Sequence, residues 1–134
     1  MNKNVNTIML AIACTAIDGN IADEEIEAIG KWKFFNQCLK EGVVSQAMDQ
    51  MKKDNSIDDA CKALSGESDE FKSNLLKGLI WLIVADQIVE DIELKYLSHV
   101  ANGLGLTPAD DKVMATLKEF NSIISAGDLE SHLI

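Results

Sequence analysis

The acidic stretch Asp18-Gly19-Asn20-Ile21-Ala22-Asp23-Glu24-Glu25 lies between two segments that have the apolar spacing of helices. A similar stretch, Asp86-Gln87-Ile88-Val89-Glu90-Asp91-Ile92-Glu93, has the same setting later in the chain. Three acids coincide when the two stretches are aligned: Asp18 with Asp86, Asp23 with Asp91 and Glu25 with Glu93. Helix patterning alone does not require this coincidence. We therefore infer an internal duplication, with repeat halves at about residues 5–39 and 69–106.

Length and composition favour a single all-α domain over residues 1–134. A chain of 134 residues has the length of one domain, and 47% hydrophobic residues can form a substantial core. The single proline and the scarcity of alternating apolar runs argue against a sheet. We expect a compact bundle of about seven helices, arranged with pseudo-twofold symmetry around two central apolar helices.

The apolar spacing predicts helices at about residues 4–17, 22–39, 43–53, 57–64, 69–85, 90–103 and 108–120. The first helix and the second half of the fifth are apolar all round, which is typical of helices in the middle of a fold. Ser56 and Ser68 are expected to cap the helices that follow them. The loosely patterned segment 40–66 is interpreted as an insertion between the halves, and residues 121–134 as a loop with a short docked helix.

The formal net charge of −10 argues against some classes of partner, although such a charge can also serve solubility alone. A protein this acidic repels nucleic acid and anionic membrane surfaces, and it attracts cations and basic partner surfaces. The apolar runs are shorter than the about 20 residues that a membrane-spanning helix needs, so we expect no membrane insertion. The cysteines, Cys14, Cys38 and Cys61, have no metal-ligand spacing. They favour a reducing, cytoplasmic location.

The carboxylates of the two turns suggest a site for a hard cation, because Ca²⁺ and Mg²⁺ prefer oxygen ligands. The first turn resembles the second half of an EF-hand loop. However, the opening ligand positions fall on Cys14 and Ala16, and in the second copy on Leu82 and Val84. A conventional EF-hand is therefore not expected. Two turns brought together would supply enough oxygens for one ion, but the sequence does not decide whether they meet.

Helix capping offers a simpler explanation for some of these acids. Acids in the first turn of a helix are favoured by roughly 0.3–1 kcal/mol each, which would account for Asp23, Glu25, Asp91 and Glu93. It does not account for Asp18 and Asp86, which are predicted at helix C-terminal ends, where a carboxylate is mildly unfavourable. All six acids are thus candidate ligands of Ca²⁺ or Mg²⁺, and Asp18 and Asp86 carry most of the hypothesis.

The sequence offers little support for catalysis or for an organic cofactor. The two histidines, His99 and His132, have no nucleophile near them in sequence, and no serine elbow, phosphate loop or paired-cysteine motif is present. We expect His99 to be a surface or boundary residue. A non-enzymatic protein is the main prediction, and an enzyme that uses paired carboxylates is a third alternative.

Two motifs resemble the TerB-like tellurite-resistance family over about residues 5–118. The first is Ile17-Asp18-Gly19-Asn20-Ile21-x-Asp23-Glu24-Glu25-Ile26. The second is Ala85-Asp86-x-x-Val89-x-x-x-Glu93-x-x-x-Leu97-x-x-x-Ala101-x-x-Leu104-Gly105-Leu106. The second motif departs from the family pattern because Gln87 replaces the usual glycine. Ala22 and Glu90 also stand where capping residues are expected, so the second turn is the weaker candidate.

The resemblance implies a duplicated helical domain in a bacterial cytosolic protein that serves resistance to tellurite or to envelope and oxidative stress. It implies partners among other stress-response proteins, including membrane-associated ones. It also implies metal binding by Asp18, Glu25, Asp86 and Glu93, with Asp23 and Asp91 as flanking candidates. The alternative is a metal-free helical module that docks a basic partner through an acidic face.

Overall fold

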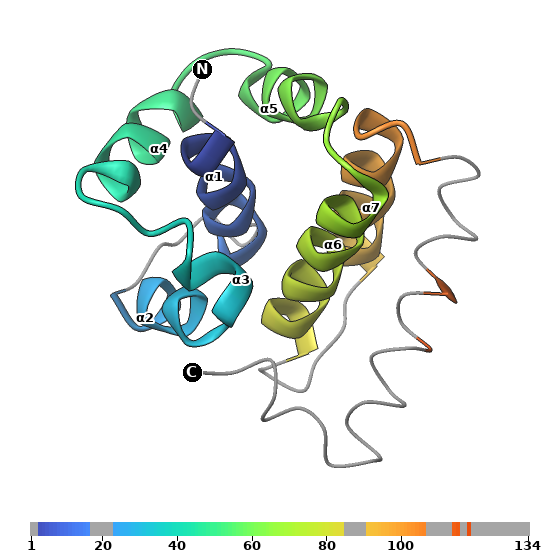
Figure 1. Cartoon of the computed structure of the whole chain (residues 1–134), viewed down its shortest axis with the longest axis horizontal. Coiled ribbons are helices and arrows are strands. Elements are labelled where there is room, and N and C mark those ends of the chain that lie inside the picture. The colour runs from blue at the N-terminus through green and yellow to red at the C-terminus, as the bar shows by residue number, and fades with distance from the viewer. Residues whose placement is uncertain (1–2, 17–22, 85–90, 107–113, 116–117, 119–134) are drawn as a thin grey trace.

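The computed structural model describes residues 3–16, 23–84, 91–106, 114, 115 and 118 (Figure 1). Within these residues the chain forms seven helices and no strand, so the predicted all-α class is confirmed. The helices are α1 (Lys3–Thr15), α2 (Asp23–Lys31), α3 (Lys33–Asn36), α4 (Val43–Met51), α5 (Ser56–Leu64), α6 (Asp69–Val84) and α7 (Asp91–Gly103).

Helix α1 lies in the middle of the bundle, as its all-round apolar sequence predicts. Every side chain from Val5 to Cys14 is buried. It packs against α4, α5 and α6, and Figure 1 shows it between α4 and α6. In α6, Leu75, Leu76 and Leu79 are fully buried, but Trp81 and Leu82 are only half-buried. Helix α6 is therefore central along one side only.

The predicted helix at 22–39 is wrong in its continuity. It divides into α2 and α3 at Trp32, whose φ of −86° and ψ of 120° are extended. The break allows Trp32 to bury its ring against Trp81, with ring centroids 5.3 Å apart. The amide Nδ2 of Asn36 donates to the carbonyl of Gly30 at 3.0 Å, which satisfies one carbonyl at the interruption. Tertiary packing of the tryptophan thus overrides the helical pattern.

The segment 40–66 contains two helices, α4 and α5, that cover α1. Val43 and Ala47 are buried, and the side-chain amide of Gln50 donates to Oδ1 of Asn6 at 2.9 Å in the interior. A buried amide needs such a partner, so this bond also orients α4 on α1. The segment is thus well packed, and its interpretation as an insertion between repeats stays a prediction.

Two serines predicted as caps differ in outcome. The hydroxyl of Ser68 accepts a hydrogen bond from the amide of Phe71 at 3.1 Å, so Ser68 caps α6 as predicted. Ser56, in contrast, is the first helical residue of α5, and Asn55 precedes the helix with a φ of 59° and no side-chain cap bond. The prediction for Ser56 is therefore wrong. Asparagine adopts this left-handed conformation more readily than most residues.

Helix α7 ends at Gly103, as the predicted range 90–103 has it, and Gly105 follows as part of its C-terminal cap. Gly105 has a φ of 82°. Its amide donates to the carbonyl of Asn102 at 3.0 Å, and the amide of Leu106 donates to the carbonyl of Ala101 at 3.0 Å. This is a Schellman ending, which needs a left-handed residue. Of the helix predicted at 108–120, only residues 114, 115 and 118 are described, and their backbone is helical. The segment 121–134 lies outside the described residues, and the pseudo-twofold duplication stays a prediction.

Candidate functional site

The predicted cation ligands differ in how far the structure describes them. Asp18 and Asp86 lie outside the described residues. Asp23, Glu25 and Asp91 are described through their helical backbone but not through their side chains. Glu93 is described fully and is half-buried. The described parts of α2 and α7 start at Asp23 and Asp91, directly after residues that the structure does not describe, so the placement of these acids in first helical turns stays a prediction.

The charge of Glu93 acts on the C-terminal end of α1. Burial raises the pKa of the Cys14 thiol, and the negative charge of Glu93 raises that pKa further. The charge of Glu93, in the first turn of α7, thus acts on a thiol in the last turn of α1. In sequence, Asp18 follows Cys14 by a few residues, and Asp86 precedes Glu93 by a few residues.

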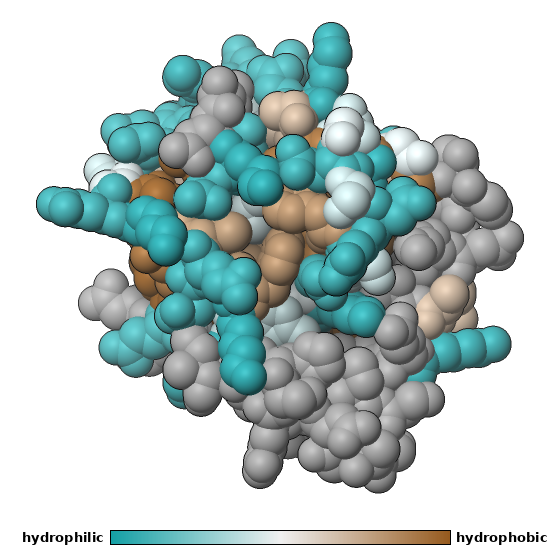
Figure 2. Space-filling view, viewed as in Figure 1, coloured by the Kyte–Doolittle hydropathy of each residue, from teal (hydrophilic) through white to brown (hydrophobic). Residues whose placement is uncertain are grey.

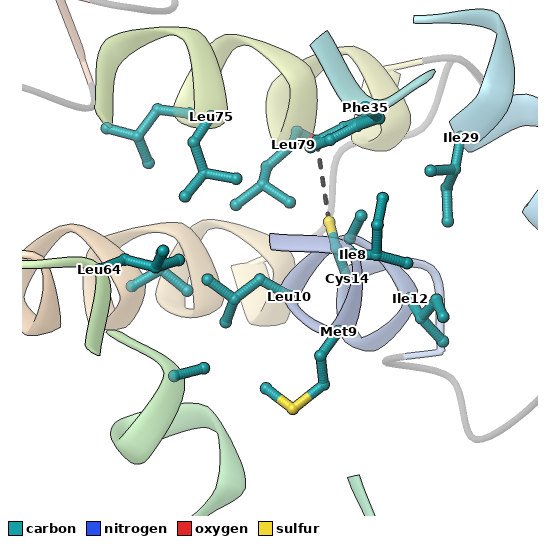
Figure 3. Close-up of a cluster of buried hydrophobic side chains, with 14 of the residues drawn as sticks. Ile8, Met9, Leu10, Ile12, Cys14, Ile29, Phe35, Leu64, Leu75 and Leu79 are labelled. Atoms are coloured by element: carbon teal, nitrogen blue, oxygen red, sulfur yellow. Dashed lines mark hydrogen bonds between the residues drawn. The ribbon is translucent and has the colours of Figure 1, made fainter. Parts of the chain in front are cut away.

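Helix α6 also contacts Cys14, the residue of α1 that the charge of Glu93 affects. The Cys14 thiol donates a hydrogen bond to the carbonyl of Leu79, with a sulfur–oxygen distance of 3.7 Å (Figure 3). In Figure 3 the Cys14 side chain points from α1 toward Leu79 on α6. Cys14 is thus a small buried residue where α1 approaches α6, with α7 close enough for Glu93 to affect its titration.

Tyr96 fixes α7 along α1. Its hydroxyl donates to the carbonyl of Leu10 at 2.7 Å. Burial raises the pKa of the Tyr96 hydroxyl well above its usual value, and the neighbouring Cys14 and Cys61 thiols raise it further. Tyr96 is one turn beyond Glu93 on α7, as Leu10 is one turn before Cys14 on α1. The Tyr96–Leu10 hydrogen bond is thus a local link between α7 and α1, whereas α7 packs mainly on α5 and α6.

The three cysteines are free and buried, which makes them unsuited to redox chemistry. Burial raises the pKa of the Cys61 thiol to about 12, and nearby Asp58 adds to this. Burial also raises the pKa of Cys38, although Lys3, Thr7 and Lys40 oppose the change. In this setting Cys14 behaves as a small hydrophobic residue.

His99 is a surface residue, as predicted. Its Nε2 lies 2.6 Å from Oδ1 of Asp58, and both side chains are more than half exposed. The contact joins α7 to α5, and nothing in it resembles a catalytic pair with a nucleophile. His132 lies outside the described residues.

The structure leaves the cation prediction untested. Among the residues it describes, no group of three or more histidine, cysteine, aspartate or glutamate side chains could hold a metal ion. Only Glu93 of the six predicted ligands contributes a side chain to that description. Over the same part of the chain, no helix combines the length and apolar character needed to cross a membrane.

Sequence reasoning missed the contacts that bring α7 to α1. Glu93 and Cys14 belong to different predicted halves, as do Tyr96 and Leu10. No local pattern marks such a pair, because each residue fits its own helix equally well without the other. The one available signal was that α1 is apolar all round, which required neighbours on every side.

Comparison with known proteins identifies the family. Residues 4–115 match the family model described as "Tellurite resistance protein TerB", which covers most of the chain. Searches of curated proteins and of solved structures gave no significant match. The family match agrees with the acidic-turn motifs and with the all-helical fold. The chain belongs to the TerB family of tellurite resistance proteins.

Proposed function

We propose that this domain is a non-enzymatic, cytoplasmic member of the TerB family that binds one divalent cation, Ca²⁺ or Mg²⁺, between its two acidic turns. In this proposal the domain serves tellurite or envelope-stress resistance through other stress-response proteins. Family membership supports the cellular role. The ligands proposed are Asp18 and Asp86, with Asp23, Glu25, Asp91 and Glu93 around them.

The observation that carries the proposal is the hydrogen bond by which Tyr96 on α7 donates to the carbonyl of Leu10 on α1 at 2.7 Å, together with the effect of the Glu93 charge on the pKa of Cys14. Glu93 belongs to the second acidic turn, and Cys14 belongs to the helix that leads into the first. If the turns lay at opposite ends of the bundle, the charge of Glu93 would not reach the thiol of Cys14. This approach of α7 to α1 therefore supports one shared site over two remote ones.

The chemistry also favours a hard cation. Carboxylate oxygens are the ligands that Ca²⁺ and Mg²⁺ prefer, and several carboxylates in one place repel one another unless a cation lies between them. The first turns of α2 and α7 offset part of this repulsion through the positive ends of their helix dipoles. A bound ion would offset the rest, including the unfavourable charge at the end of α1.

Isothermal titration calorimetry with Ca²⁺ and with Mg²⁺ tests the proposal. We expect one ion per chain and a higher melting temperature in the presence of the ion, since an ion that binds only the folded state stabilises it. Asp18→Asn, Asp86→Asn and Glu93→Gln should each weaken the same binding event. Asp54→Asn, at an exposed position between α4 and α5, removes one charge elsewhere and should leave binding unchanged.

The outcomes separate the alternatives. Two ions per chain, with Asp18→Asn and Asp86→Asn each removing one of them, would contradict the shared site but retain cation binding. An absence of heat and of any shift in melting temperature at millimolar cation would overturn the proposal altogether.

The second candidate function is docking of a basic partner on the acidic face without metal. The observation that favours it is Ile92, a large hydrophobic side chain that is 53% exposed in the first turn of α7, between Asp91 and Glu93. An exposed apolar residue among acids suits a basic amphipathic segment. Failure of both cations to bind would make this the better assignment.

A further inference from the structure

Two segments of this acidic chain contain lysines and no acid: residues 28–40 and residues 71–85. Acids outnumber basic residues by 22 to 12 over the whole chain, so the two segments depart from its general character. Their lysines are Lys31, Lys33, Lys40, Lys72 and Lys77. They also contain most of the aromatic residues: Trp32, Phe34, Phe35, Phe71 and Trp81.

The fold brings these two segments together where α3 packs on α6. Trp32 stacks on Trp81 with an interplanar angle of 23°, and Phe34 meets Phe71 edge-on with ring centroids 5.1 Å apart. Gly78 allows this close approach, because a Cβ there would lie 2.6 Å from the ring of Phe35. Residues far apart in sequence thus form one aromatic layer.

The outer side of this layer is accessible. Phe34, Phe71 and Trp81 are half-buried, and Lys31 and Lys33, which lie on either side of Trp32 in sequence, are exposed. We call these five residues the basic aromatic face. Figure 2 shows apolar side chains between the α3 and α6 regions, bordered by hydrophilic ones.

Other charges near the face limit its size. The ammonium of Lys3 lies over the Phe71 ring, 5.0 Å from its centroid, and its charge is paired with Glu67 at 3.4 Å, so Lys3 covers the Phe71 end of the basic aromatic face. Glu27 and Glu70, both exposed, border the two segments. The positive region is therefore small, and a ligand that extended beyond it would meet acids.

We propose that the basic aromatic face docks a short acidic segment of a partner protein, which packs an aromatic or aliphatic side chain against Trp81. The lysines supply charge complementarity, and the half-buried rings supply apolar area. A nucleic acid or an anionic membrane is a larger polyanion and would also face the acidic remainder of the protein. A short segment avoids this repulsion, because at physiological salt charges interact strongly only within about 8 Å, and a short segment reaches few of the more distant acids.

Selection of binders from a random-peptide display library tests the proposal on the full chain. We expect enriched peptides to be acidic and to carry at least one large apolar residue. Lys31→Gln/Lys33→Gln should weaken their binding roughly fivefold, as expected for two solvent-exposed charge pairs. Lys52→Gln/Lys53→Gln makes the same change in net charge at two exposed lysines at the end of α4, and should have little effect.

Several results would overturn the proposal. One is failure to enrich any peptide, or enrichment of peptides without acids. Another is equal loss of binding in the two lysine variants. Binding to phosphatidylserine vesicles that depends on Lys31 and Lys33, in place of peptide binding, would assign the face to membranes. A dimer that Lys31→Gln/Lys33→Gln dissociates would assign it to a second copy of this chain.

Discussion

Gly78 determines how closely α3 approaches α6. A Cβ at this position would lie 2.6 Å from Cε2 and Cζ of Phe35 and 3.1 Å from Cδ1 of Trp32. Both aromatic side chains are buried, so neither has free space into which it can move. The absence of a side chain at one position therefore permits the contact on which the whole aromatic layer depends.

Gly78→Ala should lower the free energy of unfolding by about 1–3 kcal/mol, the usual cost of overpacking a core. The better helix propensity of alanine, about 1 kcal/mol, would offset part of this loss. Urea denaturation measures the difference.

Gly66→Ala is the matched control, because nothing lies within 4 Å of a Cβ at that turn. Its stability should change by less than about 0.5 kcal/mol. A Gly78→Ala protein as stable as the original would show that Phe35 and Trp32 move aside easily.

The start of helix α6 is determined by a few polar residues at its N-terminus. Ser68 precedes the helix, and its hydroxyl accepts the amide hydrogen of Phe71 at 3.1 Å. Asp69 and Glu70 follow in the first turn, where acids complement the helix dipole. The apolar residues that bury α6 come only later, so its start depends on these polar contacts.

Ser68→Ala should destabilise the protein by about 1 kcal/mol through loss of the cap. Ser65→Ala provides a comparison, since the Ser65 hydroxyl is exposed and donates to the carbonyl of Lys62 at 2.7 Å without capping a helix start. Thermal unfolding should therefore separate the two variants. Equal melting temperatures would indicate that packing alone determines where α6 begins.

The break at Trp32 shows the opposite case, in which packing overrides a local pattern. The apolar spacing from Ile26 to Leu39 continues as one helix, and the chain nevertheless becomes extended at Trp32. Burying an indole ring against Trp81 and α6 outweighs the loss of a few helical hydrogen bonds. Local spacing holds no information about this, because Trp81 lies in the other half of the chain.

The molecule as a whole holds its three thiols and Tyr96 in an apolar interior that disfavours their charged forms. An unfolded cysteine titrates near pH 8.5, whereas burial raises the pKa of Cys61 to about 12. Above pH about 8.5 the unfolded chain loses a proton that the folded chain keeps. The stability from this difference is complete below that pH and decreases as the pH rises toward the folded value.

Between pH 9 and 11, the Cys61 thiol should therefore reduce the free energy of unfolding by up to about 1.4 kcal/mol per pH unit. Denaturation at a series of pH values, compared with Cys61→Ala, isolates the contribution of Cys61. The free energy of unfolding of the variant should fall with pH less steeply than that of the original protein, by about this slope. Its stability at neutral pH does not affect this comparison. Parallel slopes would show that Cys61 does not titrate differently in the two states.

Much of this protein follows from sequence alone. The all-α class, the central position of α1, the cap at Ser68 and the end of α7 just before Gly105 each depend on residues close together in the chain. Apolar periodicity, turn chemistry and helix dipoles act over a few residues, so a sequence displays them directly. The family match at residues 4–115 includes both acidic motifs, which are also local patterns that the sequence displays directly.

Tertiary structure alone decided the remainder. It divided the predicted second helix at Trp32, brought Glu93 near Cys14, and joined lysines and aromatic rings from two distant segments into the basic aromatic face. Each of these depends on which helix lies beside which, and that is determined by the shape and volume of side chains packed to high density. The acids Asp18–Glu25 and Asp86–Glu93 began as a repeated pattern, and the approach of α7 to α1 supports treating them as one proposed site.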